Sequence, residues 1–153
     1  MHFTQTIVAA LFAATSVVGA PAPAPVEISM MASSGIPDTT FEGVVRHCDD
    51  KDNNCTVEFT INPKRFSKTG VKFVTVRNGN VGASRNNGAA QNFGDYTVTS
   101  GWSGQFGEGK GFTTFAVVDN KDRLITYPSY TDVELANGHQ VTPDKSYKPA
   151  NLP

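Results

Sequence analysis

The sequence predicts an all-β fold, a single-domain antiparallel β-barrel or sandwich of about eight strands with one short helix at most. After residue 20 the chain has 13 Val and 13 Thr but only 3 Leu, and β-branched residues favour strands over helices. Short strand-like runs alternate with turn residues, and no window shows a 3.6-residue apolar period. About 130 residues are enough for one hydrophobic core.

The first 20 residues resemble a secretory leader. An unbroken apolar run over residues 7–14 is followed by small residues ending in Gly19 and Ala20, as signal peptidase requires. We therefore predict a signal peptide over residues 1–19, cleaved after Gly19 or Ala20, and a secreted, extracellular protein. No later apolar run is long enough for a membrane span. The Pro-, Ala- and Ser-rich residues 20–40 are expected to form an extended spacer.

Two cysteines enclose a polar hexapeptide. Cys48 ends one strand-like segment, residues 41–48, and Cys55 begins the next, residues 55–61. The loop between the two cysteines is therefore expected to connect the strands of a hairpin. In an oxidising compartment such a pair predicts a disulfide bond. Closing this small ring contributes about 2 kcal/mol in the chain-entropy model.

The same loop carries two other patterns. Asp50, Asp52 and Asn54 have the opening spacing of a calcium loop, but its glycine and glutamate positions hold Cys55 and Ile61, so we expect no metal and no cofactor. Asn54 also begins an Asn-Cys-Thr sequon, which makes Asn54 a candidate glycosylation site.

The remaining strands follow in order along the chain. Strand patterns and the Asn-Gly turns at 78–79 and 137–138 predict the β-domain over residues 41–143. Residues 144–153 are expected to form an extended C-terminal tail, and a short helix is expected near residues 62–69. The further predicted strands are 70–77, 96–100, 112–118, 123–127, 133–136 and 139–142.

Residues 101–111 place Trp102 and Phe106 among five glycines. One interpretation is a binding loop in which these aromatic residues, with Tyr127 and Tyr130, form a surface for a ligand or partner. The other interpretation, which we favour, is architectural. Glycines allow a small β-fold to turn corners, and a lone Trp commonly fills the core.

No catalytic signature is present. His47 and His139 lack metal-ligand spacing, and no G-x-S-x-G sequence supports a serine nucleophile. The pair Asp132 and Glu134 has the residue types of a glycosidase, but such pairs are expected by chance among 14 acidic residues. We therefore assign no catalytic residues and expect the protein not to be an enzyme. The net charge of −1 argues against a nucleic-acid binder.

Three segments resemble a known family. GVKFVTVRNG (70–79), YTVTSGWSGQFGEGKGFTTFAVVD (96–119) and LITYPSYTD (124–132), behind a leader and with one disulfide, resemble small secreted elicitors of plant-pathogenic fungi, the hypersensitive-response-inducing (Hrip-type) proteins of the rice-blast fungus. The resemblance implies a secreted monomeric effector that a host plant cell-surface component or receptor perceives, inducing defence responses and hypersensitive cell death. The alternatives are a module that binds cell-wall polysaccharide and, third, a small secreted hydrolase or enzyme inhibitor.

Overall fold

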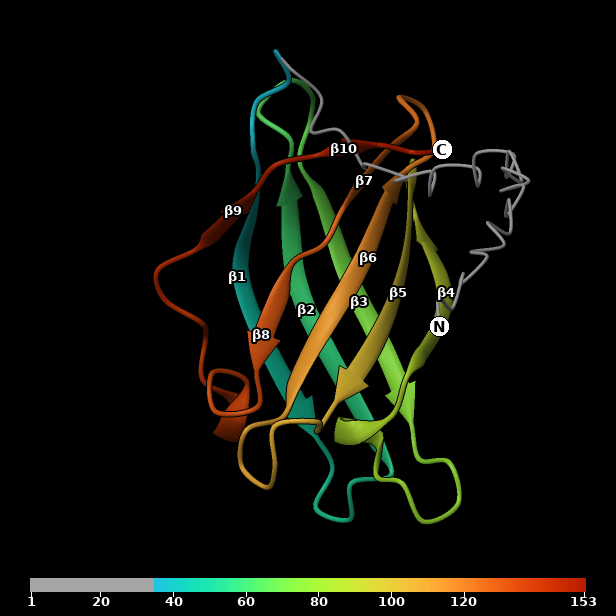
Figure 1. Ribbon diagram of the computed structural model, residues 1–153, viewed down its shortest axis with the longest axis vertical. Coiled ribbons are helices and arrows are strands. Elements are labelled where there is room, and N and C mark those ends of the chain that lie inside the picture. Colours follow the sequence, from blue (N-terminus) through green and yellow to red (C-terminus); the bar gives the residue numbers. More distant parts are fainter. Residues whose placement is uncertain (1–34) are drawn as a thin grey trace, which may run out of the picture.

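The computed structural model describes residues 35–153, which form two antiparallel sheets packed face to face (Figure 1). The predicted all-β fold is confirmed in its sandwich form. The predicted signal peptide and most of the predicted spacer lie outside the described residues. The strands are β1 (Thr39–Cys48), β2 (Asn54–Asn62), β3 (Thr69–Val76), β4 (Gly88–Phe93), β5 (Tyr96–Ser103), β6 (Phe112–Asp119), β7 (Leu124–Thr126), β8 (Ser129–Thr131), β9 (Lys145–Tyr147) and β10 (Ala150–Asn151).

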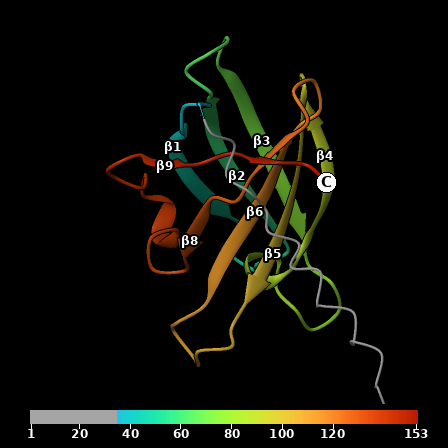
Figure 2. The ribbon, with the colours of Figure 1, turned by 45° about the horizontal axis from the view of Figure 1, so that its top comes forward.

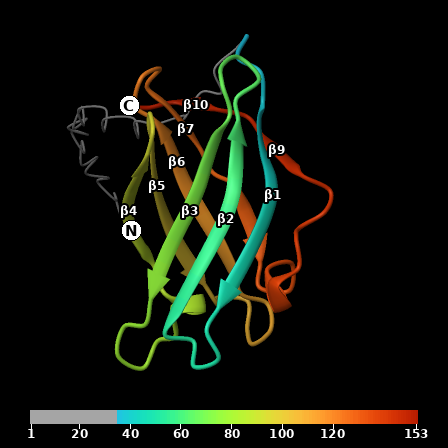
Figure 3. The ribbon, with the colours of Figure 1, turned by 180° about the vertical axis from the view of Figure 1, so that it is seen from behind.

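One sheet has the strand order β3-β2-β1-β9 and faces the viewer in Figure 3. Its centre is the predicted hairpin, in which Cys48 lies directly opposite Cys55. Their Cα atoms are 4.0 Å apart and the disulfide bond is formed. A β-bulge interrupts the register between Glu42 and Val45, where Gly43 has a φ of +64°. Such a bulge bends the strand locally.

The second sheet has the order β10-β7-β6-β5-β4, and β8 also pairs with β6. In its central hairpin Tyr96 faces Asp119 and, at the other end, Trp102 faces Thr113. Figure 2 shows the strands of this sheet passing in front of the first sheet. Strand β4 was not predicted, because its glycine- and alanine-rich sequence lacks a strand pattern.

The segment predicted as an extended tail belongs to both sheets. Strand β9 pairs with β1, and β10 pairs with β7. The β-domain therefore extends beyond the predicted boundary at residue 143. Strands of two or three residues are too short to show an alternating pattern in the sequence. They form because neighbouring strands pair with them.

The predicted strands on either side of Asn137-Gly138 do not form. Both residues have the positive φ that this dipeptide favours, but they lie in the 3₁₀ turn η2 (Ala136–Gly138). Leu135 is buried, and Val141 donates its N–H to the Val44 carbonyl at 2.7 Å. Packing on β1 therefore replaces a hairpin.

Residues 62–69 contain no helix, so that expectation was wrong. Within residues 35–153 the helical elements are η2 and a second 3₁₀ turn, η1 (Ala83–Arg85). Neither is an α-helix. Pro63 follows the end of β2, and Lys64 has a φ of +58°, a left-handed conformation that does not continue a helix.

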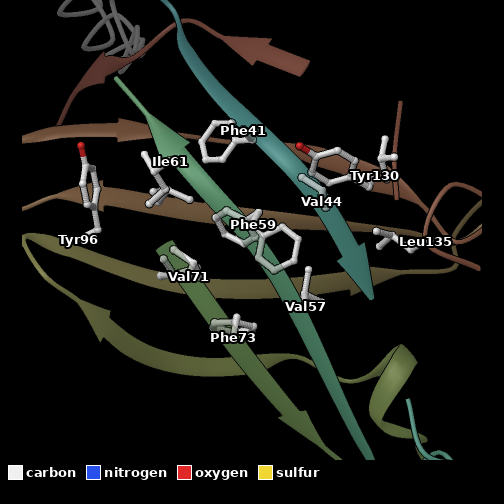
Figure 4. Packing of buried hydrophobic residues seen from close by; sticks show 14 residues of the cluster. Phe41, Val44, Val57, Phe59, Ile61, Val71, Phe73, Tyr96, Tyr130 and Leu135 are labelled. Carbon is white, nitrogen blue, oxygen red and sulfur yellow. The ribbon is translucent and has the colours of Figure 1, made fainter. Parts of the chain in front are cut away.

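Aromatic side chains fill the space between the sheets (Figure 4). The Phe115 ring of the second sheet lies 5.6 Å from both Phe59 and Phe73 of the first, measured between ring centroids. Tyr130 contacts the same ring from β8 at 6.5 Å. All three contacts are edge-to-face, an arrangement that the ring quadrupoles favour. Phe115 therefore joins the two sheets at their centre.

Side chains close both sides of the sandwich. The Gln91 amide of β4 donates to the Val74 carbonyl at 2.7 Å and accepts the Val74 N–H at 3.0 Å. On the other side the Tyr147 hydroxyl of β9 donates to the Ser129 carbonyl and accepts the Ser129 N–H. In both places one side chain satisfies both main-chain groups of an edge residue, as a neighbouring strand would.

Replacing the central ring tests this packing. Phe115→Ala is expected to lower the free energy of unfolding by about 3–5 kcal/mol, because it leaves a cavity between the sheets. The matched control is Phe106→Ala, whose side chain is 63 % exposed, and which should change stability by less than about 1 kcal/mol. Urea unfolding followed by circular dichroism measures both variants. Equal losses would contradict the central role of Phe115.

The disulfide is expected to stabilise the fold without being required for it. Cys48→Ser should give a folded protein that is about 2 kcal/mol less stable, because the ring it opens is small. A thermal melt compared with the oxidised native protein measures the effect, and the reduced native protein should match the variant. A variant that is unfolded at room temperature would show that the hairpin depends on the bond.

Candidate recognition surface

Four segments meet at one end of the sandwich, the lower end in Figure 1. These are residues 49–53, 77–87, 104–111 and 132–138, which we call the Trp102 end. The Asp52 carboxylate accepts the Ser84 N–H and hydroxyl, both at 2.8 Å. The Asp132 N–H donates to the Gly111 carbonyl at 2.9 Å. Hydrogen bonds therefore connect these segments to one another.

Asp49 organises the loop that the disulfide closes. Its carboxylate accepts the backbone N–H groups of Asn53, Asn54 and Lys51 at 2.8, 2.9 and 3.1 Å. The Asn53 hydrogen bond is the largest cause that lowers the pKa of Asp49. The candidate glycosylation site Asn54 is exposed, and its amide donates to Asp49 at 3.1 Å. The carboxylate thus serves loop structure.

One cluster in residues 35–153 brings three potential metal ligands together, Cys48, Asp52 and Cys55. Both sulfur atoms are joined in the disulfide, and a disulfide sulfur lacks the thiolate charge that binds metals. The Asp52 carboxylate is also engaged with Ser84. The cluster is therefore part of the disulfide-closed hairpin, and Asp52 connects that hairpin to the loop that contains Ser84.

Trp102 is half-buried and fixed on several sides. Its indole Nε1 donates to the Asp132 carboxylate, at 3.0 Å to Oδ2 and 3.2 Å to Oδ1. The Arg85 guanidinium lies 5.6 Å from the ring centroid, within cation–π range. A Cβ atom at Gly104 would lie 2.4 Å from the ring, and one at Gly111 would lie 2.8 Å from it. These two glycines therefore make room for Trp102, which lies at the end of the sandwich and is not part of the buried core cluster.

The acidic pair Asp132 and Glu134 does not act as a pair. Asp132 lies 3.7 Å from Arg46, whose guanidinium also donates to the Ser84 carbonyl. Glu134 instead forms an ion pair with Lys145. Desolvation raises the pKa of Glu134, but hydrogen bonds from Lys145 and Thr131 outweigh it and lower the pKa overall. Each carboxylate therefore has structural partners of its own.

Phe106 is the exposed aromatic residue of the glycine-rich loop. Its side chain is 63 % exposed and stacks on Phe112 with 5.9 Å between ring centroids and 28° between ring planes. Both rings line a groove of about 290 Å³ with Lys110 and Thr131. An exposed aromatic ring that is ordered in advance is a typical anchor for a binding partner.

Of the other two predicted aromatic residues, Tyr130 lines the same groove as Phe106 from the core side, whereas Tyr127 does not line it. Tyr127 is exposed at the turn between β7 and β8, whereas Tyr130 is only 2 % exposed and belongs to the core. Placing Tyr130 on the surface was therefore wrong. Tyr130 faces Thr113 across the sheet, and residues directly opposite in adjacent strands share a face. Thr113 points inward, so Tyr130 does too.

A second hollow at the Trp102 end was not predicted. This pocket has a volume of about 430 Å³ and lies between β1, η1 and η2. Arg46, His47 and Ser84 supply polar walls, and Leu135 supplies an apolar one. These residues come from distant segments, so no local pattern in the sequence could have identified them.

The described part of the chain contains no helix that is both long and apolar enough to cross a membrane. Its fold and its loop-built end define a class, the small β-sandwich proteins that carry one disulfide and gather several connected loops at one end.

Comparison with known proteins identifies the family. The model of the Effector TSP1 family matches residues 40–152. A protein of Hypocrea virens (strain Gv29-8 / FGSC 10586) named Effector TSP1 is 44 % identical over 153 residues, covering all of both chains. The chain therefore belongs to the Effector TSP1 family, and the prediction of a fungal effector is confirmed. These matches are to Effector TSP1 and do not confirm the resemblance to Hrip-type proteins.

The Asp132 contacts lead to a prediction that can be followed through the single Trp. Asp132→Ala removes the acceptor of the Trp102 N–H and the carboxylate beside Arg46. We expect a loss of about 1–3 kcal/mol in unfolding free energy and a red shift of the Trp emission as water reaches the indole.

The matched control is Glu108→Ala, which removes the carboxylate paired with Arg85 at 2.6 Å. That ion pair is exposed and screened by solvent, so stability should be nearly unchanged. Fluorescence-detected urea unfolding measures both variants. An unchanged emission in Asp132→Ala would show that this hydrogen bond does not fix Trp102.

Proposed function

We propose that this fungal effector is secreted, has no enzymatic activity, and acts as an elicitor. In this proposal a plant cell-surface component binds the folded protein at the Trp102 end and induces defence responses and hypersensitive cell death. Membership of the Effector TSP1 family supports the effector role. The predicted leader supports secretion. The observation that carries the proposal is the exposed Phe106 on a tethered loop.

The loop geometry favours recognition of a folded surface. Phe106 is ordered by stacking on Phe112, so binding would cost little further side-chain entropy. The loop is tied to its neighbour through the Asp132 N–H and Gly111 carbonyl. Buried aromatic anchors contribute a large share of binding energy at protein interfaces. Phe106 is therefore the residue we expect to insert into a partner.

The engaged carboxylates support a non-enzymatic role. Asp52, Asp132 and Glu134 each accept hydrogen bonds that hold loops or side chains in place. A general acid or base needs a proton that it can exchange with a substrate. Carboxylates committed to structural partners are poorly suited to that task.

Leaf infiltration tests the proposal with three forms of the purified chain. The native protein should induce defence-gene expression and local cell death, and Phe106→Ala should need about tenfold more protein, as loss of one aromatic anchor predicts. Reduced and alkylated protein that has been heated should be inactive. The matched control is Val74→Ala, because Val74 is also an exposed apolar residue, at 40 %, but lies on β3 outside the Trp102 end.

Each result bears on the proposal separately. A response to the denatured chain equal to the native one would overturn recognition of a folded surface. Equal activity of Phe106→Ala and the native protein would remove Phe106 from the binding surface. The absence of a defence response to every form of the protein in all tested hosts would reject elicitor activity. Circular dichroism of each variant confirms that the substitutions leave the fold intact.

A further inference from the structure

The opposite end of the sandwich holds a second, polar pocket. It has a volume of about 320 Å³ and lies between the β2–β3 loop, the β4–β5 turn and the β6–β7 turn, at the upper end in Figure 1. We call it the Tyr96 pocket. Its polar lining comes from Ser67, Thr69, Asp95, Tyr96, Asp119 and Lys121.

Tyr96 forms the floor and presents an unused hydroxyl. The side chain is 7 % exposed, and its hydroxyl has no hydrogen-bond partner within the part of the chain that is described. Figure 4 shows this hydroxyl pointing away from the packed rings of the core. Unlike the Tyr130 hydroxyl, which is fully buried, the Tyr96 hydroxyl is open to solvent through the pocket. The fold therefore keeps a donor available at the bottom of the pocket.

The surroundings of this hydroxyl determine its protonation state. Desolvation, followed by the nearby Asp119 carboxylate, raises the pKa of Tyr96 to about 12. The phenol therefore keeps its proton at any physiological pH and can donate a hydrogen bond.

Hydrogen bonds hold the walls in place. Asn120 donates both its N–H and its side-chain amide to the Asp95 carbonyl at 3.0 Å. Asp119 Oδ1 accepts the N–H groups of Lys121 and Asp122, both at 3.0 Å. An ion pair of 2.9 Å between Arg65 and Asp122 connects the β2–β3 loop to the β6–β7 turn. The pocket is therefore built before any ligand arrives.

Two acceptors remain open in these walls. Within residues 35–153 the Asp95 carboxylate accepts no hydrogen bond, and both bonds to Asp119 use Oδ1, which leaves Oδ2. Carboxylate oxygens each accept more than one hydrogen bond. The pocket thus combines open acceptors with the Tyr96 donor.

The charges around the pocket select against charged ligands. A cation would be attracted by Asp95 and Asp119 but repelled by Lys121 in the lining and Arg65 beside it, and for an anion the attraction and the repulsion are reversed. An unpaired like charge in a partly desolvated site is costly. A neutral molecule with several hydroxyl groups can instead pair with both the carboxylates and the phenol.

The apolar wall and the volume of the pocket further restrict the class of ligand that it can bind. Phe66 lines the pocket, and its ring has Arg65 at 4.9 Å and Lys121 at 5.5 Å from its centroid. The ring is still 52 % exposed, and its uncovered part offers apolar surface to the C–H groups of a sugar ring. The volume is near the lower limit of small-molecule sites, which is about 300 Å³. From these features we propose that the Tyr96 pocket binds one neutral sugar residue. This site is separate from the aromatic surface considered for polysaccharide binding and does not depend on the elicitor proposal.

An NMR titration of the ¹⁵N-labelled chain tests the proposal. The probes are glucose, xylose and N-acetylglucosamine, each beside its β-1,4-linked pentasaccharide. Saturable shifts are expected for the amides of Ser67, Asp95, Tyr96 and Asp119. If the sugar and its oligomer have equal dissociation constants on a molar basis, the ligand is a free sugar or a chain end. If the oligomer has a much lower dissociation constant, the ligand is a chain end that makes further contacts outside the pocket.

Two variants separate the Tyr96 hydroxyl from general effects. Tyr96→Phe should weaken binding about five- to tenfold, the effect of one lost hydrogen bond. Tyr130→Phe is the matched control, because it also removes a tyrosine hydroxyl without a partner, one that is fully buried and lies outside the pocket, and this variant should bind normally. Glucosamine and glucuronate should bind more weakly than glucose.

Three results would overturn the proposal. They are the absence of saturable shifts with every neutral probe, normal binding by a folded Tyr96→Phe variant, and tighter binding of either charged analogue. Leaf responses do not enter this test, so its failure leaves the elicitor proposal unaffected.

Discussion

The contact of Phe115 with Phe59 and Phe73 is the constraint on which the rest of the molecule depends. It joins the centre of one sheet to the centre of the other and sets how the strands of the second sheet lie across the first. Because Phe115 is on β6, it also fixes the β5–β6 hairpin. Tyr96 and Trp102 are at opposite ends of β5. One packing contact therefore positions both candidate sites.

The two ends of this hairpin use the same inward face in different ways. Side chains alternate along a strand, so Tyr96, Val98, Ser100 and Trp102 all point between the sheets. In the middle of the strand they meet the opposite sheet and are buried. At the ends they meet loops instead. There Trp102 is covered by charged partners, whereas Tyr96 keeps an open hydroxyl.

The glycine-rich loop shows that glycine serves packing as well as flexibility here. Gly104 and Gly111 leave space for the Trp102 ring, while Gly107 and Gly109 adopt positive φ values that turn the loop. The fixed Trp102 in turn holds Asp132, to which Arg46 is paired. The exposed Phe106 therefore lies on a loop that packs against the fixed Trp102 ring.

The sequence by itself determined the strand over residues 55–61, the Cys48–Cys55 hairpin and the all-β class, because each depends on neighbours within one or two strands. Only the tertiary structure decided which aromatic residues are exposed. Tyr127 and Tyr130 flank the same Pro128, yet the pairing of β8 with β6 turns Tyr130 into the core. The short strands β9 and β10 and the Tyr96 pocket likewise depend on residues far apart in the chain. Burial is a property of the packed neighbours, which local spacing does not specify.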